Sequence, residues 1–554
     1  MFLERLCELR NRLTEIPPPH HENKEVSWYL EICQGGDFYV WTKNNSHLII
    51  PYRGRGNNPP PLLLVDNISF VLGIPAPDDK KLTLEDAEKR HRDFINLIQE
   101  FHDSLEEDSR KDVQSILKFM EGEGIQKALQ ELPALKKQHL ICFLVGGKKA
   151  HEIPGASEFW AKKRDLEISE ASEWKTQCPL CREIKGIPEI TSMTFPLGGE
   201  RTKIVSANCN SFESYGLKGS RNAPICEPCS RKYGEALQFL LSKENHRFTI
   251  GNSTYLFWTR EKTDFEPLSV LKSPQPEDVA NLFRNPFQGF GGESVNPKDF
   301  YFVALSPNKT RLIIRDYTES SLDNVVESLK KWFQKQTLYT ASENPKKYHG
   351  VYALASSLVP NKNQKTPDWN KLPPQVIPIL LRGALFSAPL PKWFLSLAIQ
   401  RVCVETKHRL TRPRIALIKM VLTDNLTEGS VTESLDENNK GPGYLCGRLF
   451  AVLESLQWYA LGDLNSSITD RFYSSASTTP MLVFPSLIQK AQPHLKKVNK
   501  KIFVVIDKQI TEILSHVQEF PRVFNLQDQA FFSLGYYHQR EKNFRGKDKT
   551  SGTE

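Results

Sequence analysis

Cys178-Pro-Leu-Cys181 and Cys226-Glu-Pro-Cys229 are the two stretches that commit this chain to a definite local structure. Each Cys-x-x-Cys turn directs two thiolates at one point, and two such turns supply the four soft ligands that tetrahedral zinc prefers. The intervening residues 182–225 form a longer spacer than in compact zinc fingers, but zinc ribbons accept insertions between their knuckles. We therefore expect all four cysteines to hold one structural zinc ion, which closes a loop near the middle of the chain and adds its binding energy to folding.

Other interpretations of the cysteines remain open at this point. The two pairs can instead form disulfides or remain buried thiols, and Cys209, inside the loop, can compete as a ligand or be a small buried residue. A thioredoxin-like redox site needs a single Cys-x-x-Cys beside a βαβ unit. Catalytic zinc is disfavoured because four cysteines leave no coordination position for water.

Composition sets broad limits on the chain. With 554 residues and 39% hydrophobic content, it is long enough for several domains with sizeable cores. A net charge of +8 is compatible with a nucleic-acid partner without requiring one. The remaining cysteines have no framework spacing, the N-terminal stretch has no signal-peptide pattern, and no run of eighteen apolar residues appears, so we expect a cytoplasmic protein without a membrane span.

Hydrophobic periodicity predicts an α+β multidomain chain. A helix is expected within residues 1–16, strands at 26–32, 38–42 and 141–145, helices across 82–134, a hairpin of 300–305 with 311–316, and helical segments from 376 onward. The predicted divisions are a mixed α/β N-terminal domain (1–172), an inserted zinc-ribbon-like element (173–262), the remainder of the α/β region (263–345), a helical connector (376–423) and an all-helical C-terminal bundle (444–541). Residues 342–376 and 424–443 are expected to be linkers.

The sequence contains few signs of catalysis. It has no Gly-x-x-x-x-Gly-Lys-Ser/Thr phosphate loop, no Gly-x-Ser-x-Gly elbow and no His-Glu-x-x-His. His102-Asp103 is of a type found in metal-dependent nucleases, but it lies in a charged helical stretch without co-ligands at a suitable spacing, which favours a solvated helix face. We therefore expect a binding or scaffolding protein rather than an enzyme.

Ten short stretches, in order along nearly the whole chain, resemble one family, the large subunit of the type I-C CRISPR interference complex (Cascade). They are residues 26–31, 64–73, 206–216, 222–224, 257–258, 305–308, 416–422, 447–454, 473–477 and 534–540. The most specific are Gly447-Arg-Leu-Phe-Ala-Val-Leu-Glu454 and Leu534-Gly-Tyr-Tyr-His-Gln-Arg540. Many members of the family keep at most part of the cysteine set, so zinc is predicted from this sequence and is not implied by the family.

The resemblance implies a non-catalytic subunit at the end of a guide-RNA complex that carries the 5′ handle. Such a subunit recognises the short motif that flanks the DNA target (the PAM), assists opening of the duplex into an R-loop, and recruits a helicase–nuclease. The implied partners are the guide RNA (crRNA), target DNA, the handle-binding and backbone subunits, and the helicase–nuclease. RNA–DNA pairing reads the target sequence, as in the single-protein effector.

Three groups of residues are candidates for nucleic-acid contact under this reading, each with a plain solvated surface as the alternative. Arg53, Arg55, Asn57 and Asn58 lie in the Gly- and Pro-rich loop 53–61 and have the side chains that read base edges. Arg221 and Asn222 precede the second cysteine pair. The third group, on the expected C-terminal bundle, is placed to line the path of the displaced strand; it comprises Arg471, Lys496, Lys497, Lys500 and Lys501.

Met420 precedes the linker 424–443 and suits an internal translation start that would yield the C-terminal bundle as a separate small subunit. Two alternatives to the Cascade reading are a zinc-ribbon DNA-processing enzyme and a zinc-ribbon DNA-binding regulator.

Overall fold

The computed structural model describes residues 2–53, 59–172, 174–188, 193–205, 210–250, 252–261, 267–284, 299–341, 348–362, 366–405, 409–427, 429, 431–462 and 466–548. The chain divides into two compact units. Unit 1 comprises Met1–Phe239 with Pro307–Ile313, and unit 2 comprises Leu240–Ser306 with Ile314–Glu554. The α+β class expected from the sequence is confirmed, while the finer five-part division stays a prediction.

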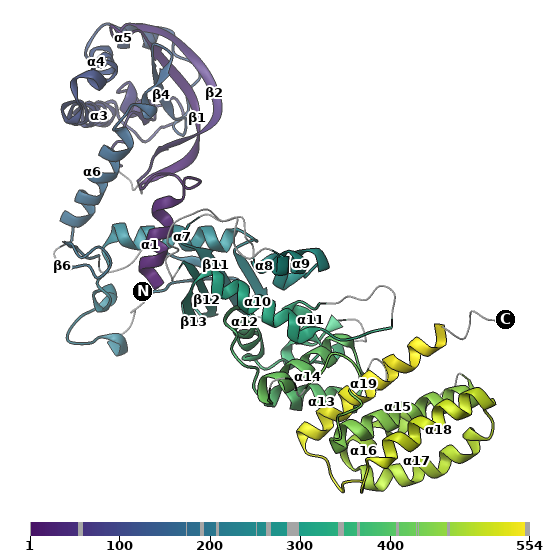
Figure 1. Ribbon diagram of the computed structural model, residues 1–554. Helices are drawn as coiled ribbons and strands as arrows, with labels where there is room; N and C mark the ends of the chain where they lie inside the picture. The colour runs from purple at the N-terminus through teal and green to yellow at the C-terminus, as the bar shows by residue number, and fades with distance from the viewer. Residues whose placement is uncertain are drawn as a thin grey trace. The chain divides into compact units, whose positions relative to one another are not determined.

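A mixed sheet is the centre of unit 1 (Figure 1). Strands β1 (His21–Ile32) and β2 (Phe38–Pro51) form a long antiparallel hairpin. Strand β1 also pairs in parallel with β4 (Ile141–Val145), which is flanked by β3 (Val65–Asp66) and β5 (Lys148–Lys149). The hairpin turns at Gly36, whose φ of +93° and close approach to Lys118 Cβ suit only glycine. The strands predicted at 26–32, 38–42 and 141–145 are confirmed.

Helices bury an apolar stripe against this sheet. Helix α3 (Leu84–Ser104) begins at the N-cap Thr83, which accepts a hydrogen bond from Asp86 N, and buries Phe94, Ile98 and Phe101 at helical spacing. Helix α2 (Ile68–Val71) precedes it, and α4 (Glu107–Glu121) and α5 (Gly124–Gln130) follow. These helices share one hydrophobic cluster with β1 and β4, so the predicted helical region 82–134 is confirmed as three separate helices.

The rest of unit 1 surrounds the cysteine pairs with short elements. In chain order they are α1 (Phe2–Arg12), η1 (Ala150–Glu152), α6 (Ala156–Glu170), the hairpin β6 (Lys175–Gln177)–β7 (Ile184–Gly186), the hairpin β8 (Phe195–Leu197)–β9 (Glu200–Thr202), η2 (Asn210–Phe212), η3 (Gly219–Asn222) and α7 (Glu227–Ser242). Between α6 and α7 the described chain forms short strands and 3-10 turns, so a metal clip is a physically reasonable source of order there.

Unit 2 begins with a four-stranded sheet in the order β10 (Arg247–Ile250), β11 (Ser253–Thr259), β12 (Phe300–Asn308), β13 (Arg311–Ser320). Neighbouring aromatic rings on β11 and β12 pack together, with 5.3 Å between the ring centroids of Phe257 and Phe302. Helices α8 (Pro267–Lys272) and α9 (Pro276–Arg284) follow β11, and α10 (Leu322–Gln336), capped by Ser321, follows β13. The predicted hairpin is confirmed.

The predicted linker 342–376 is wrong in part, because the chain there forms regular elements. They are α11 (Val351–Ser356), the small hairpin β14 (Asn361–Lys362)–β15 (Thr366–Pro367) and η4 (Trp369–Lys371). Val351 and Leu354 are fully buried, so the helix is held by tertiary packing that the polar composition around it conceals.

Helices form the remainder of unit 2. They are α12 (Val376–Phe386), α13 (Trp393–Val404), α14 (Arg412–Asn425), α15 (Pro442–Leu461), α16 (Ile468–Thr478), α17 (Pro480–Leu495), α18 (Lys500–Ser515) and α19 (Leu526–Asp548). Figure 1 shows α15 to α18 gathered as a bundle, with α19 along α15. One hydrophobic cluster runs from the sheet to α19.

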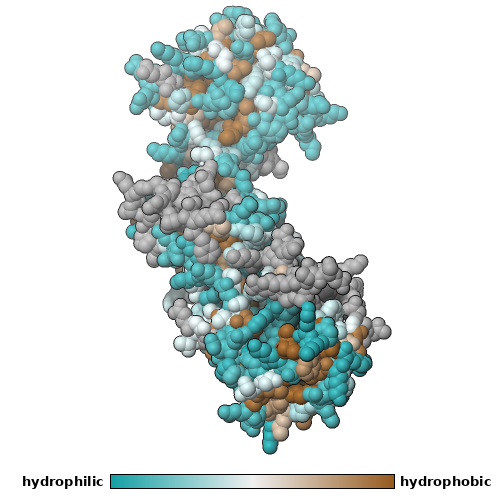
Figure 2. Space-filling view, turned by 45° about the vertical axis from the view of Figure 1, so that its right-hand side comes forward, coloured by the Kyte–Doolittle hydropathy of each residue, from teal (hydrophilic) through white to brown (hydrophobic). Residues whose placement is uncertain are grey.

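Two expectations for the C-terminal bundle need correction. The spacing of apolar residues between 502 and 517 predicts one buried helical stripe, formed by Ile502, Val505, Ile506, Ile510, Ile513 and Val517. On α18 only Ile506 and Ile513 of these are buried, and Val505 is 56% exposed. The polar composition of residues 542–554 predicts a frayed tail, but helix α19 continues to Asp548. Figure 2 shows apolar side chains gathered over part of the bundle surface. Within the described residues, no helix is both long and apolar enough to cross a lipid bilayer.

Candidate metal centre and basic surfaces

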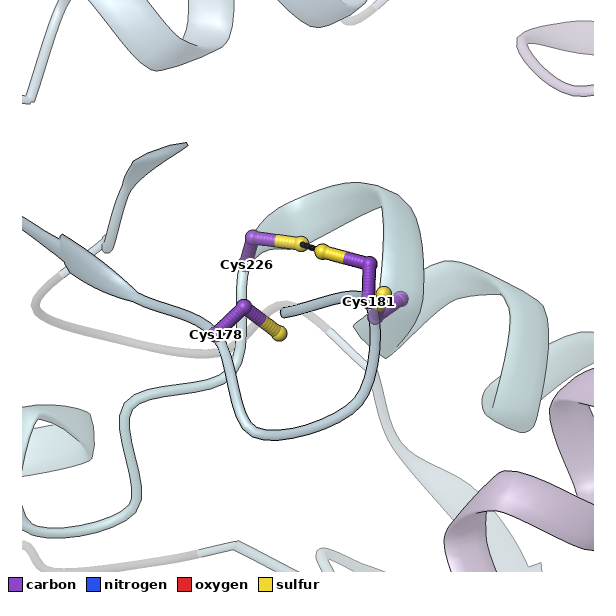
Figure 3. Close-up of side chains that lie close together, drawn as sticks. Cys178, Cys181 and Cys226 are labelled. Atoms are coloured by element: carbon purple, nitrogen blue, oxygen red, sulfur yellow. Dashed lines mark hydrogen bonds between the residues drawn. The ribbon is translucent and has the colours of Figure 1, made fainter. Parts of the chain in front are cut away.

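The four cysteines of the two Cys-x-x-Cys turns meet at one point in unit 1. Their sulfur atoms all lie within 4.8 Å of one another, and those of Cys181 and Cys226 are 3.8 Å apart. Figure 3 shows the side chains of Cys178, Cys181 and Cys226 converging from a loop and from the start of a helix. The structure therefore confirms the prediction that the two distant motifs bring their four sulfur atoms together.

Local backbone structure presents the first pair. Cys178 N donates to Glu183 O at 2.9 Å, and Arg182 N donates to Cys178 O at 2.8 Å, so the chain folds back around the two thiols. Arg182 has a φ of +63°, a left-handed conformation that a non-glycine residue adopts only where its surroundings stabilise it. The flanking strands β6 and β7 hold this turn from both sides.

The second pair uses the start of α7. Cys226 directly precedes the helix, Cys229 lies in its first turn, and Ser230 N donates to Cys226 O at 2.9 Å. Pro228 suits this first turn, where its missing N–H costs no hydrogen bond. A helix N-terminus also favours negative charge, and so stabilises thiolates over thiols.

The thiols differ in proton affinity because they hydrogen-bond to one another. Donation from Cys226 and Cys229 lowers the pKa of Cys178, which becomes the first thiolate. The same hydrogen bond to Cys178 raises the pKa of Cys226 to about 12 and also raises the pKa of Cys229. Without a cation the cluster thus favours one anion with thiol donors around it, because further thiolates would repel it.

The donor set fits a structural zinc ion. With Zn–S bonds of about 2.3 Å, tetrahedral geometry requires sulfurs about 3.8 Å apart, which is the separation of Cys181 and Cys226. A disulfide needs about 2.05 Å between sulfurs, and all four cysteines are free thiols. Four thiolates would complete the coordination, so a zinc ion here would link the two turns and leave no position for a reacting water. Cys209, the alternative ligand, lies outside the described residues.

Helix α1 supports the second knuckle, which the sequence did not reveal. Cys7 Sγ donates to Cys229 O at 3.7 Å, and burial raises the pKa of Cys7 to about 11, so it remains a thiol donor. Arg10 on the same helix pairs with Glu235 of α7 at 2.5 Å. In the sequence Cys7 is only a scattered cysteine, because nothing local shows that residues 7 and 229 are neighbours.

The loop predicted to read the flanking motif is described only at its edge. Arg53 pairs with Glu167 of α6 at 3.2 Å, and its side chain is 15% exposed. Arg55, Asn57 and Asn58 lie outside the described residues. A role for these four residues in binding stays a prediction, and Arg53 would have to leave or share its carboxylate partner to meet a nucleic acid.

The second candidate pair has structural partners in this conformation. The Arg221 guanidinium lies 5.6 Å from the centroid of the Trp174 ring, a cation–π contact. The Asn222 amide donates to Leu217 O and Gly219 O and so stabilises the turn η3. Nucleic-acid contact by either residue stays a prediction.

The third group is divided: its four lysines lie at the turn between α17 and α18, whereas Arg471 lies on α16, and nucleic-acid contact by any of the five stays a prediction. Lys496, Lys497, Lys500 and Lys501 are all exposed, and among the described residues none has a carboxylate partner. Arg471, on α16, is also exposed and donates from Nε to Ser466 Oγ at 3.1 Å. Sequence reasoning did not single out Lys490 and His494, which lie four residues apart on one face of α17, the helix that ends just before these lysines.

The His102-Asp103 pair lies near the end of α3, where Asp103 is exposed and His102 is half-buried. His102 Nδ1 and Asp103 Oδ1 are 3.0 Å apart, and the hydrogen bond from His102 lowers the pKa of Asp103. In the described part of the chain, the four-cysteine cluster is the only group of three or more His, Cys, Asp or Glu side chains close enough to share a metal ion. The expected solvated helix face therefore agrees with the structure, and the expected absence of catalysis stays a prediction.

Comparison with known proteins gives one finding. A family model described as CRISPR-associated protein (Cas_Csd1) matches residues 3–544, which is nearly the whole chain. No curated protein matches the chain.

Proposed function

The chain belongs to the CRISPR-associated protein family Cas_Csd1, and from this premise we propose that it is the non-catalytic large subunit of a type I-C Cascade guide-RNA complex. The match over residues 3–544 is the observation that carries the proposal. The ordered sequence resemblances at both ends of the chain support the more specific assignment to this subunit.

In this role the chain recognises the target-flanking motif, binds target DNA, assists R-loop formation and recruits the helicase–nuclease. Guide pairing reads the target sequence, so the protein needs only a short base-reading loop and a surface that attracts phosphates. The loop 53–61 has residues suited to the first task. The exposed lysines at the α17–α18 turn support the second, because cationic side chains at phosphates release counterions and strengthen binding.

The remaining surface and the metal centre have supporting roles. The exposed apolar side chains of the bundle, among them Leu482 and Val504, suit contact with another subunit. Zinc at the four cysteines orders the knuckle region between α6 and α7 and takes no part in chemistry.

Co-purification tests the proposal directly. Tagged chain expressed with its neighbouring genes and a repeat array is expected to recover a repeat-derived RNA together with backbone subunits. Recovery of neither would overturn the proposal. Sustained cleavage of labelled DNA by the purified chain with Mg²⁺ or Mn²⁺ would instead indicate a DNA-processing enzyme, and tight sequence-specific DNA binding without guide RNA would indicate a regulator.

The loop assignment is tested by Arg53→Gln combined with Arg55→Gln. Weaker binding of every target indicates phosphate contact, whereas a relaxed flanking-motif preference indicates base reading. Because Arg53→Gln also removes the ion pair with Glu167, Glu167→Gln is the matched control. Unchanged target binding in the double variant would exclude the loop from recognition.

The small-subunit proposal concerns Met420, which lies fully buried in α14. Met420→Leu keeps a similar core volume and removes the start codon. We expect the full-length chain to persist while a short C-terminal product disappears from a gel; a short product that remains unchanged would contradict an internal start at this position.

A further inference from the structure

A small cavity lies among α15, α16 and α17 of the C-terminal bundle. Its volume is about 180 Å³, and one side is apolar, formed by residues such as Leu453, Phe472 and Leu487. Polar and basic side chains, those of Arg471, Lys490 and His494, also line this cavity. No Asp or Glu is among the described residues that line it.

Several polar groups at this cavity have no hydrogen-bond acceptor among the residues that the structure describes. His494 Nδ1 is buried without a hydrogen-bond partner among the described residues. Gln457 Oε1 accepts from Ile468 N at 2.9 Å, which leaves its amide NH₂ available. Lys490 Nζ lies 5.3 Å from the centroid of the Phe472 ring and has no carboxylate partner in the described part of the chain. The donors therefore exceed the acceptors, which is the requirement for an anion.

Nearby polar groups do not satisfy these donors. The closest carboxylate in sequence, Asp470, accepts from Ser467 N and Oγ in the capping box of α16. That box and Gln457 accept from the backbone N–H groups of Ser467 and Ile468, and Ser467 Oγ accepts from Asp470 N. Binding at this site would therefore rely mainly on side chains rather than on the helix terminus. Ser466 Oγ is already bound to Arg471 Nε.

The positive charge continues beyond the cavity along α17. Lys490 and His494 lie four residues apart on one face of α17, which contains no acidic residue, and Lys497 follows in the turn after the helix ends at Leu495. Burial and the Lys497 charge lower the pKa of His494, so this side chain contributes a hydrogen-bonding group and the lysines contribute the charge. From Lys490 to the end of the helix the rise is about 8 Å. The face leads to the exposed Lys496, Lys500 and Lys501 at the next turn, so cationic groups line a path rather than a single point.

We propose that this cavity binds one backbone phosphate of a single nucleic-acid strand, whose next phosphates follow α17 toward the α17–α18 turn. The Phe472 side supplies an apolar surface for the adjoining sugar or base, as strand-binding proteins combine aromatic contacts with a cationic groove. The proposal rests on the proposed function for its ligand, and it assigns Lys490 and His494 to strand binding.

The test uses purified full-length chain and a fluorescein-labelled single-stranded DNA of mixed sequence, with fluorescence anisotropy measured over a salt series. Lys490→Gln with His494→Gln is expected to weaken binding roughly tenfold and to reduce the salt slope by about one phosphate contact, near 0.7. Lys508→Gln, an exposed lysine of the same bundle outside the cavity, is the matched control and should bind like wild type. Lys490→Arg alone should retain affinity, because it keeps the charge.

Equal affinity and equal salt slope in the double variant and wild type would overturn the proposal. Competition by inorganic phosphate at the same phosphate concentration as the oligonucleotide would also overturn it, because the cavity would then be a free-phosphate site. A thermal melt of each variant verifies that the bundle stays folded.

Co-purification separates this inference from the proposed function. If the double variant still recovers guide RNA and backbone subunits but binds the strand like wild type, the cavity assignment fails and the subunit assignment survives. If wild-type chain recovers no guide RNA, the subunit assignment fails, while the anisotropy result still decides whether the cavity binds a strand.

Discussion

Four sulfur atoms within 4.8 Å of one another cannot all be thiolates unless a cation lies among them. The hydrogen bonds of Cys226 and Cys229 to Cys178 partly relieve this by leaving a single anion. Zinc would replace those shared protons and fix all four sulfurs at once, so metal binding is coupled to proton release and to local folding.

We expect about one zinc per purified chain by elemental analysis, and its loss in Cys178→Ser or Cys229→Ser. Chelation should lower the melting temperature, because the knuckle region would lose its cross-link. Cys33→Ser, an exposed cysteine outside the cluster, is the control and should keep its metal. A carefully purified wild-type chain without zinc would show that the cysteine turns are stable alone.

A buried histidine makes stability depend on pH. His538 accepts or donates through Nδ1 with the Tyr444 hydroxyl at 3.0 Å, and burial, with the Lys419 charge, lowers the pKa of His538 to about 3. An unfolded histidine titrates near 6.5, so between about pH 3 and 6.5 the unfolded chain binds the extra proton and stability falls as pH falls.

Urea unfolding at pH 7 and pH 5 checks this expectation. His538 should account for about 2 kcal/mol of the stability that the wild type loses between these values. His538→Gln should show a correspondingly weaker pH dependence, while His47→Gln, an exposed histidine, should behave like wild type. The same pH dependence in wild type and His538→Gln would contradict a neutral buried imidazole.

At the scale of elements, the backbones of α15 and α19 approach each other closely, because each helix places glycines against the backbone of the other. A Cβ at Gly443 would lie 2.3 Å from Asp528 O, one at Gly447 would lie 2.1 Å from Phe532 O, and one at Gly535 would lie 2.4 Å from Tyr444 O. The cost of helical glycine, about 1 kcal/mol each, is offset by the close contact of the two helices.

Gly447→Ala is therefore expected to destabilise unit 2 by about 1–3 kcal/mol in denaturant unfolding, because α19 must move away. Gly441→Ala, at the N-cap of the same helix, meets only the movable Asn439 side chain, so it should show no helix–helix clash and should cost only the usual N-cap preference for glycine over alanine, about 0.5–1 kcal/mol. Equal stability of Gly447→Ala and wild type would show that α19 can shift without loss.

At the scale of the whole molecule, the two units have separate hydrophobic cores. In unit 1 the core lies between the sheet and α3 to α5, and in unit 2 it runs from the sheet to the C-terminal helices. Each core is large enough to unfold cooperatively by itself. The metal site belongs to unit 1 alone.

Calorimetry of the full chain should therefore show two transitions. Chelation should lower the unit 1 transition and leave the other in place, whereas Gly447→Ala should lower only the second. A single transition that both changes shift together would mean that the two units unfold as one.

Local sequence patterns predicted structure well where apolar residues recur at a regular spacing or where the residue types have a specific chemistry. The strand at 141–145, the hairpin of 300–305 with 311–316 and the helices from 376 onward follow from short-range spacing. The failures, α11 within an expected linker and the exposed Val505, occurred where burial against distant residues outweighs local polarity or hydrophobicity.

The sequence by itself determined the four metal-ligand candidates and the mixed class, because these depend on residue types at fixed spacing, and its resemblance to a known family indicated a CRISPR-associated protein. Only the tertiary structure decided that the two cysteine pairs meet, that Cys7 and Arg10 support them, and that Arg53 has a carboxylate partner. It also decided that Lys490 and His494 share a cavity with Arg471. These contacts join residues far apart in the chain, or on different helices, and their formation depends on packing energy that no local pattern records.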